Sequence, residues 1–386
     1  MRSAVTCIKS PGAALFTDTA TCRTITLSRP DALNVMSLPM VQDLHRLYIT
    51  EPHPNEDAVY VVRGDGRRSF CAGGDLKALT GPERDTHNPL FYRLEYEVDS
   101  HIAVMRRTQV AMWAGHVLGS GVGVSVHSRY RVACETTRFA MPETQIGGAN
   151  DVATSWVFSS LPICGLGMYL AITGNALQGA DVFHAGLATH YIPVEKFGAV
   201  EAALAALPSS EGVEECLRGF SEDVAVPPFT LAESAPVLAK AFGTITPWTR
   251  LRDIMDVLRA DGSAFAASTL EVMERNSPLG MTLALENMKR QHTPGCNTVM
   301  ESFRGDYTAI QTSIFADELA KGVEALFVTK EKRPQWTVES VDEVDVELVK
   351  QQFALTEGVR VSAGGKDGRA CFGVFGCYRA QASPVG

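Results

Sequence analysis

One glycine-dense stretch constrains the fold of this chain more than any other. Between Trp113 and Asp151, glycines at positions 119, 121 and 123 are interspersed with valines at positions 122, 124 and 126. Glycines at this density mark backbone that comes close to another group or adopts dihedral angles that other residues avoid. The valines suit a buried helix, and the first N–H groups of a helix have no partner within it. Such a helix start, with its positive dipole end, is equipped to hold an oxyanion or a phosphate.

Two carboxylates follow the glycine turn. Glu143 and Asp151 lie eight residues apart, and each is flanked by residues typical of turns. Carboxylates beside an anion-binding turn are candidates for acid/base or nucleophilic catalysis. A Pro-Glu-Thr turn and an Asn-Asp turn are also ordinary loop chemistry. The residues alone leave both interpretations open.

Hydrophobic periodicity before this stretch predicts an α/β fold. Thr24–Leu27 alternates like a strand, Leu38–Tyr48 keeps helical spacing, and Ala58–Val62 and Gln109–Trp113 are short apolar runs typical of buried strands. A strand–helix–strand unit that ends in the glycine turn of Ser69–Asp75 predicts a largely parallel sheet with ligand chemistry at strand ends. Further strands are expected at 129–133, 139–141 and 190–192, and further helices at 156–161, 166–173 and 181–187.

The pattern changes after about residue 205. We expect a core over 20–205, a helical region over 206–350 that includes one helix over Val299–Phe315, and a tail of low order over 351–386. Residues 1–19 carry Arg2 and Lys9 among Ser, Thr and Ala residues. That segment is read either as a mitochondrial targeting leader or as a frayed terminus before the first strand.

Composition narrows the class of protein. The chain has 386 residues, of which 45% are hydrophobic and 20% charged, so a large buried core is expected. A net charge of −9 argues against a general binder of nucleic acid. The nine cysteines show no CxxC pair and no Cys/His ligand spacing, which predicts neither a disulfide framework nor a metal site. No apolar run is long enough to cross a bilayer.

Seven segments carry a resemblance to a known family. They are Ile25–Asn34, Ser69–Asp75, Val122–His127, Phe139–Thr144, Asp181–His190, Asp261–Phe265 and Lys330–Trp336, and they extend over roughly residues 20–340. In this order they resemble the crotonase (enoyl-CoA hydratase/isomerase) superfamily, and most closely its 3-hydroxyisobutyryl-CoA hydrolase branch. The resemblance implies a crotonase-like spiral of ββα units with a C-terminal helical region. It also implies an acyl-CoA thioester as substrate, with coenzyme A as part of that substrate and no separate cofactor.

The resemblance also implies an oxyanion hole. By position, its two donors would be the N–H groups of Gly74 and Ser120, with Gly121 and Gly123 in the same substrate-binding turn. Attack on a thioester drives negative charge onto the carbonyl oxygen, and fixed N–H donors stabilise that charge more than they stabilise the ground state. The family usually has glycine where this chain has Ser120, whose Cβ is expected to strain the turn or crowd the thioester.

Catalytic roles follow for the two carboxylates. Glu143 matches the active-site glutamate of the family, and Asp151 matches the aspartate that the hydrolase branch uses beside it. Glu143 would attack the carbonyl carbon or activate water, and Asp151 would position water or move a proton. Hydratases of the family have a second glutamate where this chain has Gly123. The resemblance therefore favours hydrolysis over hydration.

Other candidate residues are tied to the family more loosely. Ala32, Asp75 and Lys330 are expected near coenzyme A, where Lys330 would pair with phosphate; a solvated run of charge is an equally open interpretation of Lys330. Arg93 and Glu95 match a family segment near the pocket, and a surface ion pair is an equally open interpretation of both.

Two function classes remain. The first is hydrolysis of a short branched 3-hydroxyacyl-CoA in mitochondrial valine breakdown. The second is a structural role in the small subunit of the mitochondrial ribosome, because members of the same branch serve there and Gly148–Asn150 departs from the usual pattern before the aspartate. An isomerase or lyase acting on another acyl-CoA through Glu143 alone is a third, weaker option. The sequence does not indicate an oligomeric state.

Overall fold

The computed structural model describes residues 12–310, 313–331, 333–354, 359–362 and 371–374. Residues 1–11 of the segment considered as a leader lie outside the described residues, whereas Ala13–Asp18 form strand β1. Most of the tail beyond residue 354 also lies outside them. Within that tail, β11 (Val359–Ser362) pairs antiparallel with β12 (Cys371–Val374).

Apart from this hairpin, the strands of the described residues form two sheets. The larger has the order β1-β2-β3-β5-β7-β10 and is parallel except between β1 and β2. The smaller has the order β4-β6-β8-β9 and is parallel except between β8 and β9. Their bounds are β1 Ala13–Asp18, β2 Cys22–Ser28, β3 Val59–Gly64, β4 Ser69–Ala72, β5 Gln109–Trp113, β6 His116–Leu118, β7 Tyr130–Ala133, β8 Arg138–Ala140, β9 Leu177–Gln178 and β10 His190–Tyr191.

From β3 to β8, successive strands alternate between the two sheets. Each of β3, β5 and β7 in the larger sheet is followed by β4, β6 or β8 in the smaller one, and a helix follows each pair. These helices are α2 (Leu76–Leu79) and α3 (Arg84–Val104) after β4, α4 (Ser120–Val126) after β6, and α5 (Thr154–Ser159) and α6 (Leu166–Thr173) after β8. The predicted α/β spiral of ββα units is confirmed.

This arrangement brings three strand ends to one edge of the smaller sheet. Ala72 of β4 is in register with Leu118 of β6, and Leu118 is in register with Ala140 of β8. Because the three strands are parallel, the residues that follow them emerge side by side. The glycine turns after β4 and β6 and the segment that carries Glu143 are thereby placed next to one another.

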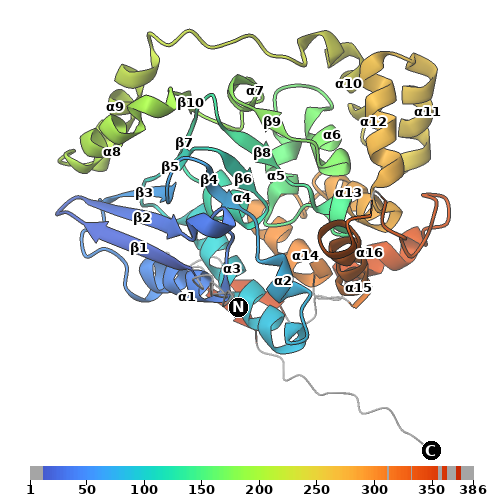
Figure 1. The fold of residues 1–386 in the computed structure, drawn as a ribbon, viewed down its shortest axis with the longest axis horizontal. Helices are drawn as coiled ribbons and strands as arrows, with labels where there is room; N and C mark the ends of the chain where they lie inside the picture. Colours follow the sequence, from blue (N-terminus) through green and yellow to red (C-terminus); the bar gives the residue numbers. More distant parts are fainter. Residues whose placement is uncertain (1–11, 311–312, 332, 355–358, 363–370, 375–386) are drawn as a thin grey trace, which may run out of the picture.

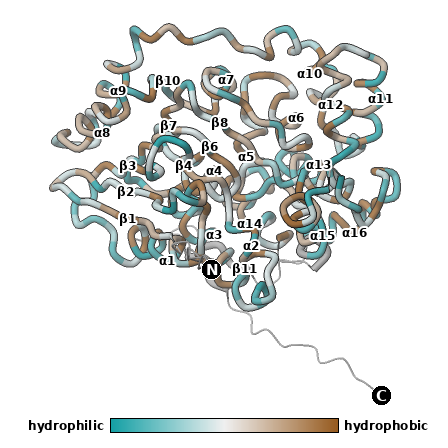
Figure 2. The backbone as a smooth tube through the Cα atoms, viewed as in Figure 1, coloured by the Kyte–Doolittle hydropathy of each residue, from teal (hydrophilic) through white to brown (hydrophobic). Residues whose placement is uncertain are grey.

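The core lies around the inner strands. All of β5 is buried, as are most residues of β3, which is the pattern of parallel strands covered on both faces. The rings of Trp113 and Phe139 lie 5.5 Å apart between their centroids, and Phe139 packs against Phe158 of α5 at 6.4 Å. Hydrophobic segments accordingly run through the central strands and α4 in Figure 2.

The chain after β9 is mostly helical. Its helices are α7 Ala180–His184, α8 Phe197–Ala205, α9 Val213–Ser221, α10 Ala235–Phe242, α11 Leu251–Asp261, α12 Ala264–Arg275, α13 Pro278–Arg290, α14 Val299–Ile310, α15 Ser313–Val323 and α16 Val346–Ala354, and α1 (Leu38–His45) precedes β3. Figure 1 shows α8 and α9 at one end and α10 to α12 at the other. α13 packs against α6, and α14 packs against α3. None of the described helices is long and apolar enough to cross a bilayer.

The predicted helix over Val299–Phe315 corresponds to α14 and the first residues of α15. α14 extends to Ile310 and α15 starts at Ser313, and the two residues between them lie outside the described residues. α14 lies against α3, whereas α15 lies against the short helix η3 (Glu143–Ile146).

Candidate active site

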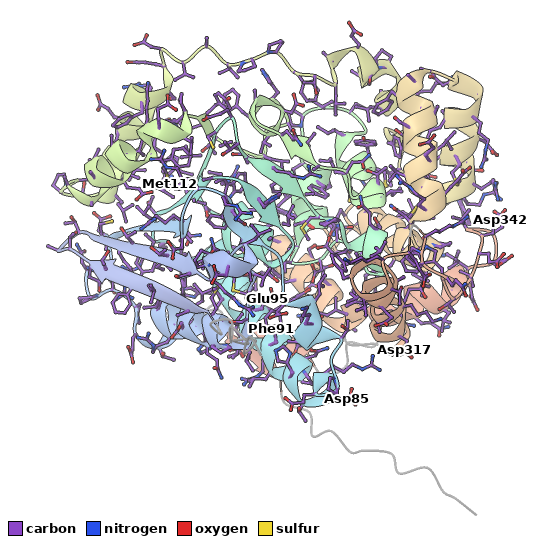
Figure 3. The ribbon with its side chains drawn as sticks, in the orientation of Figure 1. Asp85, Phe91, Glu95, Met112, Asp317 and Asp342 are labelled. Atoms are coloured by element: carbon purple, nitrogen blue, oxygen red, sulfur yellow. The ribbon has the colours of Figure 1, made fainter. Side chains whose placement is uncertain are left out.

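A cavity of about 1750 Å³ opens where the three strand ends meet. Its inner wall includes Phe91 and Glu95 of α3, which lie near the middle of the molecule in Figure 3. Its outer rim includes the exposed residues Asp85 and Asp317, which lie lower in the same view. Arg84 bridges the rim through an ion pair with Asp317 at 3.2 Å. The cavity therefore runs from the interior to the surface between α3 and α15.

The cavity gathers most of the predicted site residues. Gly74, Ser120, Glu143 and Asp151 line it, together with the predicted coenzyme A contacts Ala32 and Asp75. Lys330 is not among the described residues that line it, and follows the short helix η7 (Glu324–Thr329) with a left-handed φ of 59°.

The turn after β4 fixes the orientation of Gly74. Met36 N–H donates to the Gly73 carbonyl at 2.8 Å, and Asp75 N–H donates to the Met36 carbonyl at 2.9 Å. Gly73 has a φ of +97°, which favours glycine. Asp75 then caps α2 by accepting from Lys77 N–H at 3.2 Å and pairs with Arg29 at 2.6 Å. The Gly74 peptide is held on both sides by these bonds.

The turn after β6 lies against the first. Gly119 has a φ of +47°, and a Cβ built there would lie 3.0 Å from Glu143 Oε1 and 3.4 Å from Gly73 Cα. A Cβ on Gly74 would lie 3.3 Å from Ser120 Oγ. Ser120 is the first residue of α4, where an N–H has no partner within the helix. None of the hydrogen bonds within the described part of the chain uses the N–H of Gly74 or of Ser120.

Gly121 and Gly123 have a packing role. A Cβ on Gly121 would lie 2.5 Å from the Cys71 carbonyl oxygen, and one on Gly123 would lie 2.2 Å from Asp99 Oδ2. Both glycines are buried, and neither is among the described residues that line the cavity. They allow α4 to approach β4 and α3, so the structure does not bring them into contact with the cavity as the sequence suggested.

Glu143 is the first residue of η3, immediately after β8. Its side chain is within the cavity wall, and its Oε2 has no hydrogen-bond partner among the described residues. Burial, and then the neighbouring charge of Asp151, raise the pKa of Glu143 well above its usual value. Both effects favour the protonated form of the Glu143 carboxyl.

Asp151 is the more acidic member of the pair. Burial raises the pKa of Asp151 to about 6, and a hydrogen bond donated by the Tyr96 hydroxyl at 3.1 Å opposes that rise. Asp151 is thus mostly ionised at neutral pH, beside a Glu143 whose surroundings favour its protonated form. The two environments separate the pKa values of the carboxyls, as expected for an acid and a base that work together.

Of the two interpretations of Arg93 and Glu95, the surface ion pair between them is wrong. Arg93 pairs with Glu97 at 3.5 Å, whereas Glu95 is only 5% exposed and lines the cavity. Glu95 follows buried Phe91 by one helical turn on α3. The i, i+4 spacing to a large apolar residue was the signal that would have placed Glu95 inside.

Two further cavity residues come from the C-terminal helices. Asp306 of α14 accepts from Ala153 N–H at 2.8 Å and from the Asn287 side chain at 2.7 Å. Burial raises the pKa of Asp306 to about 7. Both Asp306 and Asn287 line the cavity, but no motif marks them in the sequence.

Backbone N–H groups without a partner and buried carboxyls line one cavity at the edge of a ββα spiral, an arrangement suited to stabilising an oxyanion. The family model for enoyl-CoA hydratase/isomerase matches residues 22–353, and the chain belongs to this family. The resemblance inferred from the seven segments is thereby confirmed.

Curated relatives and solved structures extend this assignment. The chain is 34% identical over 350 residues to the mitochondrial 3-hydroxyisobutyryl-CoA hydrolase of Xenopus laevis, with 89% of each chain covered. It is 32% identical over 337 residues to the human protein of that name, with 85% of each covered. A carnitinyl-CoA dehydratase from Mycobacterium thermoresistibile superposes with a TM-score of 0.78 at 27% identity, covering 89% of this chain and 97% of the other. An enoyl-CoA hydratase from Rhodobacter sphaeroides 2.4.1 gives 0.75 at 28% identity, with 88% and 97% covered.

Proposed function

We propose that this protein hydrolyses the thioester bond of a short branched 3-hydroxyacyl-CoA, with 3-hydroxyisobutyryl-CoA as the leading candidate. The observation that carries the proposal is the meeting of the Gly74 and Ser120 N–H groups with Glu143 and Asp151 in one cavity. The relatives described above are named as this hydrolase, and the present chain matches each of them over most of its length. Their names also support a mitochondrial location, and we propose that the reaction serves valine breakdown. Coenzyme A enters as part of the substrate, and no separate cofactor is proposed.

The chemistry begins at the thioester carbonyl. Its oxygen accepts from the Gly74 and Ser120 N–H groups, which stabilise the negative charge that develops during attack. Asp151 takes the proton of Glu143, and the resulting Glu143 carboxylate attacks the carbonyl carbon or deprotonates the attacking water. Coenzyme A leaves as its thiolate and receives a proton from Asp151. If Glu143 has attacked directly, water then cleaves the mixed anhydride and the free acid is released.

Hydration or dehydration of an acyl-CoA is the second candidate function. The names of the two superposed structures favour it. The surroundings of Gly123 oppose it, because that position has no carboxyl and Asp99 Oδ2 occupies the space that a side chain would need. The structural role in the mitochondrial ribosome has no observation in its favour here and is not proposed.

A product assay on the purified full-length chain separates these functions. We expect saturable release of free thiol and of the carboxylic acid from 3-hydroxyisobutyryl-CoA. The same preparation should leave an enoyl-CoA essentially unconverted. Hydration of the enoyl-CoA would be measured by the loss of absorption from its conjugated double bond. Hydration of the enoyl-CoA without thiol release from the hydroxyacyl-CoA would overturn the proposal in favour of the second function.

A further inference from the structure

We propose that Asp306 of α14 is a positioning residue for Asp151, and that it acts by holding the strained turn at Val152 and Ala153. The inference rests on the proposed function, because it concerns how the same site keeps Asp151 in place. It adds a third acid, which supports the backbone, to the two acids that carry out the chemistry. It follows from the backbone strain beside Asp151 and from the hydrogen bonds that hold the strained residues.

The two residues after Asp151 have a strained backbone. Val152 has a φ of 49° and Ala153 has a φ of 58°, which is the left-handed region that favours glycine. A β-branched side chain is especially unfavourable there, and Val152 is the only β-branched residue with a positive φ in the part of the chain that the structure describes. Such a backbone persists only where the surrounding structure holds it, and it is found most often at active sites. The turn therefore needs partners that keep it in this conformation.

Asp306 is one of three side chains that hold the turn. Ala153 N–H donates to Asp306 Oδ2 at 2.8 Å. The other two bonds are made by Val152, whose carbonyl accepts from His127 Nε2–H at 2.9 Å and whose N–H donates to the Tyr96 hydroxyl at 3.5 Å. Val152 and Ala153 are buried, so a bond that is lost there is not replaced by bulk water. The bond to Asp306 is the shortest of the three and the only one to a carboxyl group, which is the stronger kind of acceptor.

Both carboxyl oxygens of Asp306 are committed to protein donors. Its Oδ1 accepts from the side-chain amide of Asn287 on α13 at 2.7 Å. Asp306 is buried, and neither of its oxygens is among the buried atoms that lack a partner in the described residues, whereas Oε2 of Glu143 is. Asp306 lines the cavity, but its bonds direct it to the backbone beside Asp151 and not to the substrate.

The turn is connected directly to the Asp151 side chain. The Tyr96 hydroxyl that accepts from Val152 N–H also donates to Asp151 Oδ2 at 3.1 Å. The Asp151 carbonyl accepts from the Thr154 hydroxyl at 2.7 Å, at the start of α5. Release of the turn would therefore move the Asp151 carboxyl relative to Tyr96. A displacement of about 1 Å at a reacting group can cost about 100-fold in rate.

A double-mutant cycle tests whether Asp306 acts through Asp151. We would measure kcat and KM for thiol release from 3-hydroxyisobutyryl-CoA with wild type, Asp306→Ala, Asp151→Asn and the double variant. Asp306→Ala should lower kcat about 10–100-fold and leave KM within about threefold, because the change affects the chemistry and not the binding. In the Asp151→Asn background, the same change should lower kcat less than about threefold, because the group that Asp306 positions is already lost. Asp306→Asn keeps an oxygen that accepts from Ala153 N–H and should recover most of the lost kcat.

Asp181→Ala is the matched control. Asp181 is also a buried acid that holds a distant backbone segment, since it accepts from Thr230 N–H at 2.8 Å. It is not among the described residues that line the cavity. Asp181→Ala should lower the midpoint of thermal unfolding and keep kcat within about threefold. An equal fall of kcat for Asp306→Ala in both backgrounds, an unchanged kcat, or normal turnover by Asp151→Asn would overturn the inference.

Asn287→Ala takes the place of Asp306→Ala in the cycle if the latter does not fold. It removes the bond that fixes Asp306, so kcat should fall about three- to tenfold when Asp151 is present and remain unchanged in the Asp151→Asn background. The same fall in both backgrounds, or no fall, would contradict the inference.

If the wild-type protein releases no thiol, the proposed function fails by itself, and a crystal structure of the folded variant decides the role of Asp306. The Tyr96 hydroxyl should then lie beyond hydrogen-bond distance of Asp151. A Tyr96–Asp151 bond that keeps its length of 3.1 Å would show that Asp306 does not position Asp151.

Discussion

At the scale of single residues, the surroundings of Gly123 explain why no residue with a carboxyl side chain fits at that position. A Cβ there would lie 2.2 Å from Asp99 Oδ2 and 3.1 Å from Val152 Cβ, so any side chain must displace a buried acid. The space that a second catalytic carboxylate would enter is already occupied. The absence of a hydratase-like carboxyl is therefore built into the packing of α3 against α4.

We predict that Gly123→Ala destabilises the fold by about 1–3 kcal/mol, because overpacking forces buried neighbours to shift. Chemical denaturation would measure the loss. Asp99→Ala in the same chain should restore much of the stability by removing the clash. Gly198→Ala is the control, since Gly198 lies in α8 with nothing within 4 Å of the added Cβ. Equal stability of Gly123→Ala and Gly198→Ala would contradict this packing.

Tyr96 is the residue that tunes Asp151. Its hydroxyl donates to Asp151 and lowers the pKa of that carboxyl against the effect of burial. Because the mechanism needs ionised Asp151, activity should be lost as the pH falls through about 6. Tyr96→Phe removes the hydrogen bond, so the pKa of Asp151 rises and the acidic limb of the kcat/KM profile moves to higher pH.

The pH profile of Tyr96→Phe is compared with that of Tyr48→Phe. Tyr48 is another buried tyrosine, and it donates to Gln109 outside the cavity lining. Its removal should leave the acidic limb where it is. If the acidic limb of the kcat/KM profile does not move in Tyr96→Phe, the ionisation of Asp151 does not determine that limb.

At the scale of elements, the start of α4 carries the proposed oxyanion donor, the N–H group of Ser120. Ser120 is the first helical residue, where proline is tolerated because its missing N–H would make no bond within the helix. The preceding Gly119 has no Cβ to clash with a proline ring. The helix can therefore lose this donor and keep its fold.

Ser120→Pro should lower kcat by about 10²–10³-fold, the usual effect of losing one oxyanion donor. Ser120→Gly keeps the N–H and loses only the hydrogen bond to Glu95, so we expect a fall of less than about tenfold. Circular dichroism and thermal unfolding would verify that both variants are folded. Similar activity of the two variants would exclude the Ser120 N–H as an oxyanion donor.

The elements also show how far sequence patterns reach. Gln109–Trp113 and Leu166–Thr173 were predicted with the bounds that β5 and α6 have, because long apolar runs between clear turn signals leave little choice. The strands β6 and β9 were not predicted, since three and two residues are too short for a period to appear. They exist because the neighbouring strands of the smaller sheet offer hydrogen bonds.

The sequence predicted only those site residues that belong to short local motifs. Gly74, Ser120, Glu143 and Asp151 belong to short motifs and were named from the sequence, and the structure brings them to one cavity. Asp306 reaches the same cavity from about 150 residues further along the chain, held by the Ala153 N–H. Nothing in the local sequence indicates that contact, because it depends on how α14 packs against α3.

At the scale of the whole molecule, the cavity concentrates buried acids. Burial raises the pKa values of Asp151, Asp306 and Glu95 to about 6, 7 and 8, whereas unfolded carboxyls titrate near 4. Between about pH 4 and about pH 8, the folded chain thus binds more protons than the unfolded chain. The stabilisation that these three protonated carboxyls contribute is fully present below about pH 4. It is lost as the pH rises through their folded-state pKa values of about 6 to about 8.

We therefore expect the free energy of unfolding to fall between about pH 5 and about pH 9. Urea unfolding at a series of pH values would measure the slope. Glu95→Gln cannot ionise, so its slope should be shallower, with the largest gain over wild type at the alkaline end. Stability that stays constant or rises over this range, or parallel slopes for the two proteins, would rule out the buried protonated state of Glu95.

The account as a whole depends on Glu143, and release of thiol from 3-hydroxyisobutyryl-CoA by wild type and Glu143→Gln tests it most directly. Glutamine resembles the protonated form of glutamate, which burial favours at position 143, so the variant should fold with unchanged or slightly higher stability. Loss of the nucleophile or base should lower kcat by at least about 100-fold. Wild-type turnover with near-normal turnover in folded Glu143→Gln would contradict the mechanism and remove Glu143 from it.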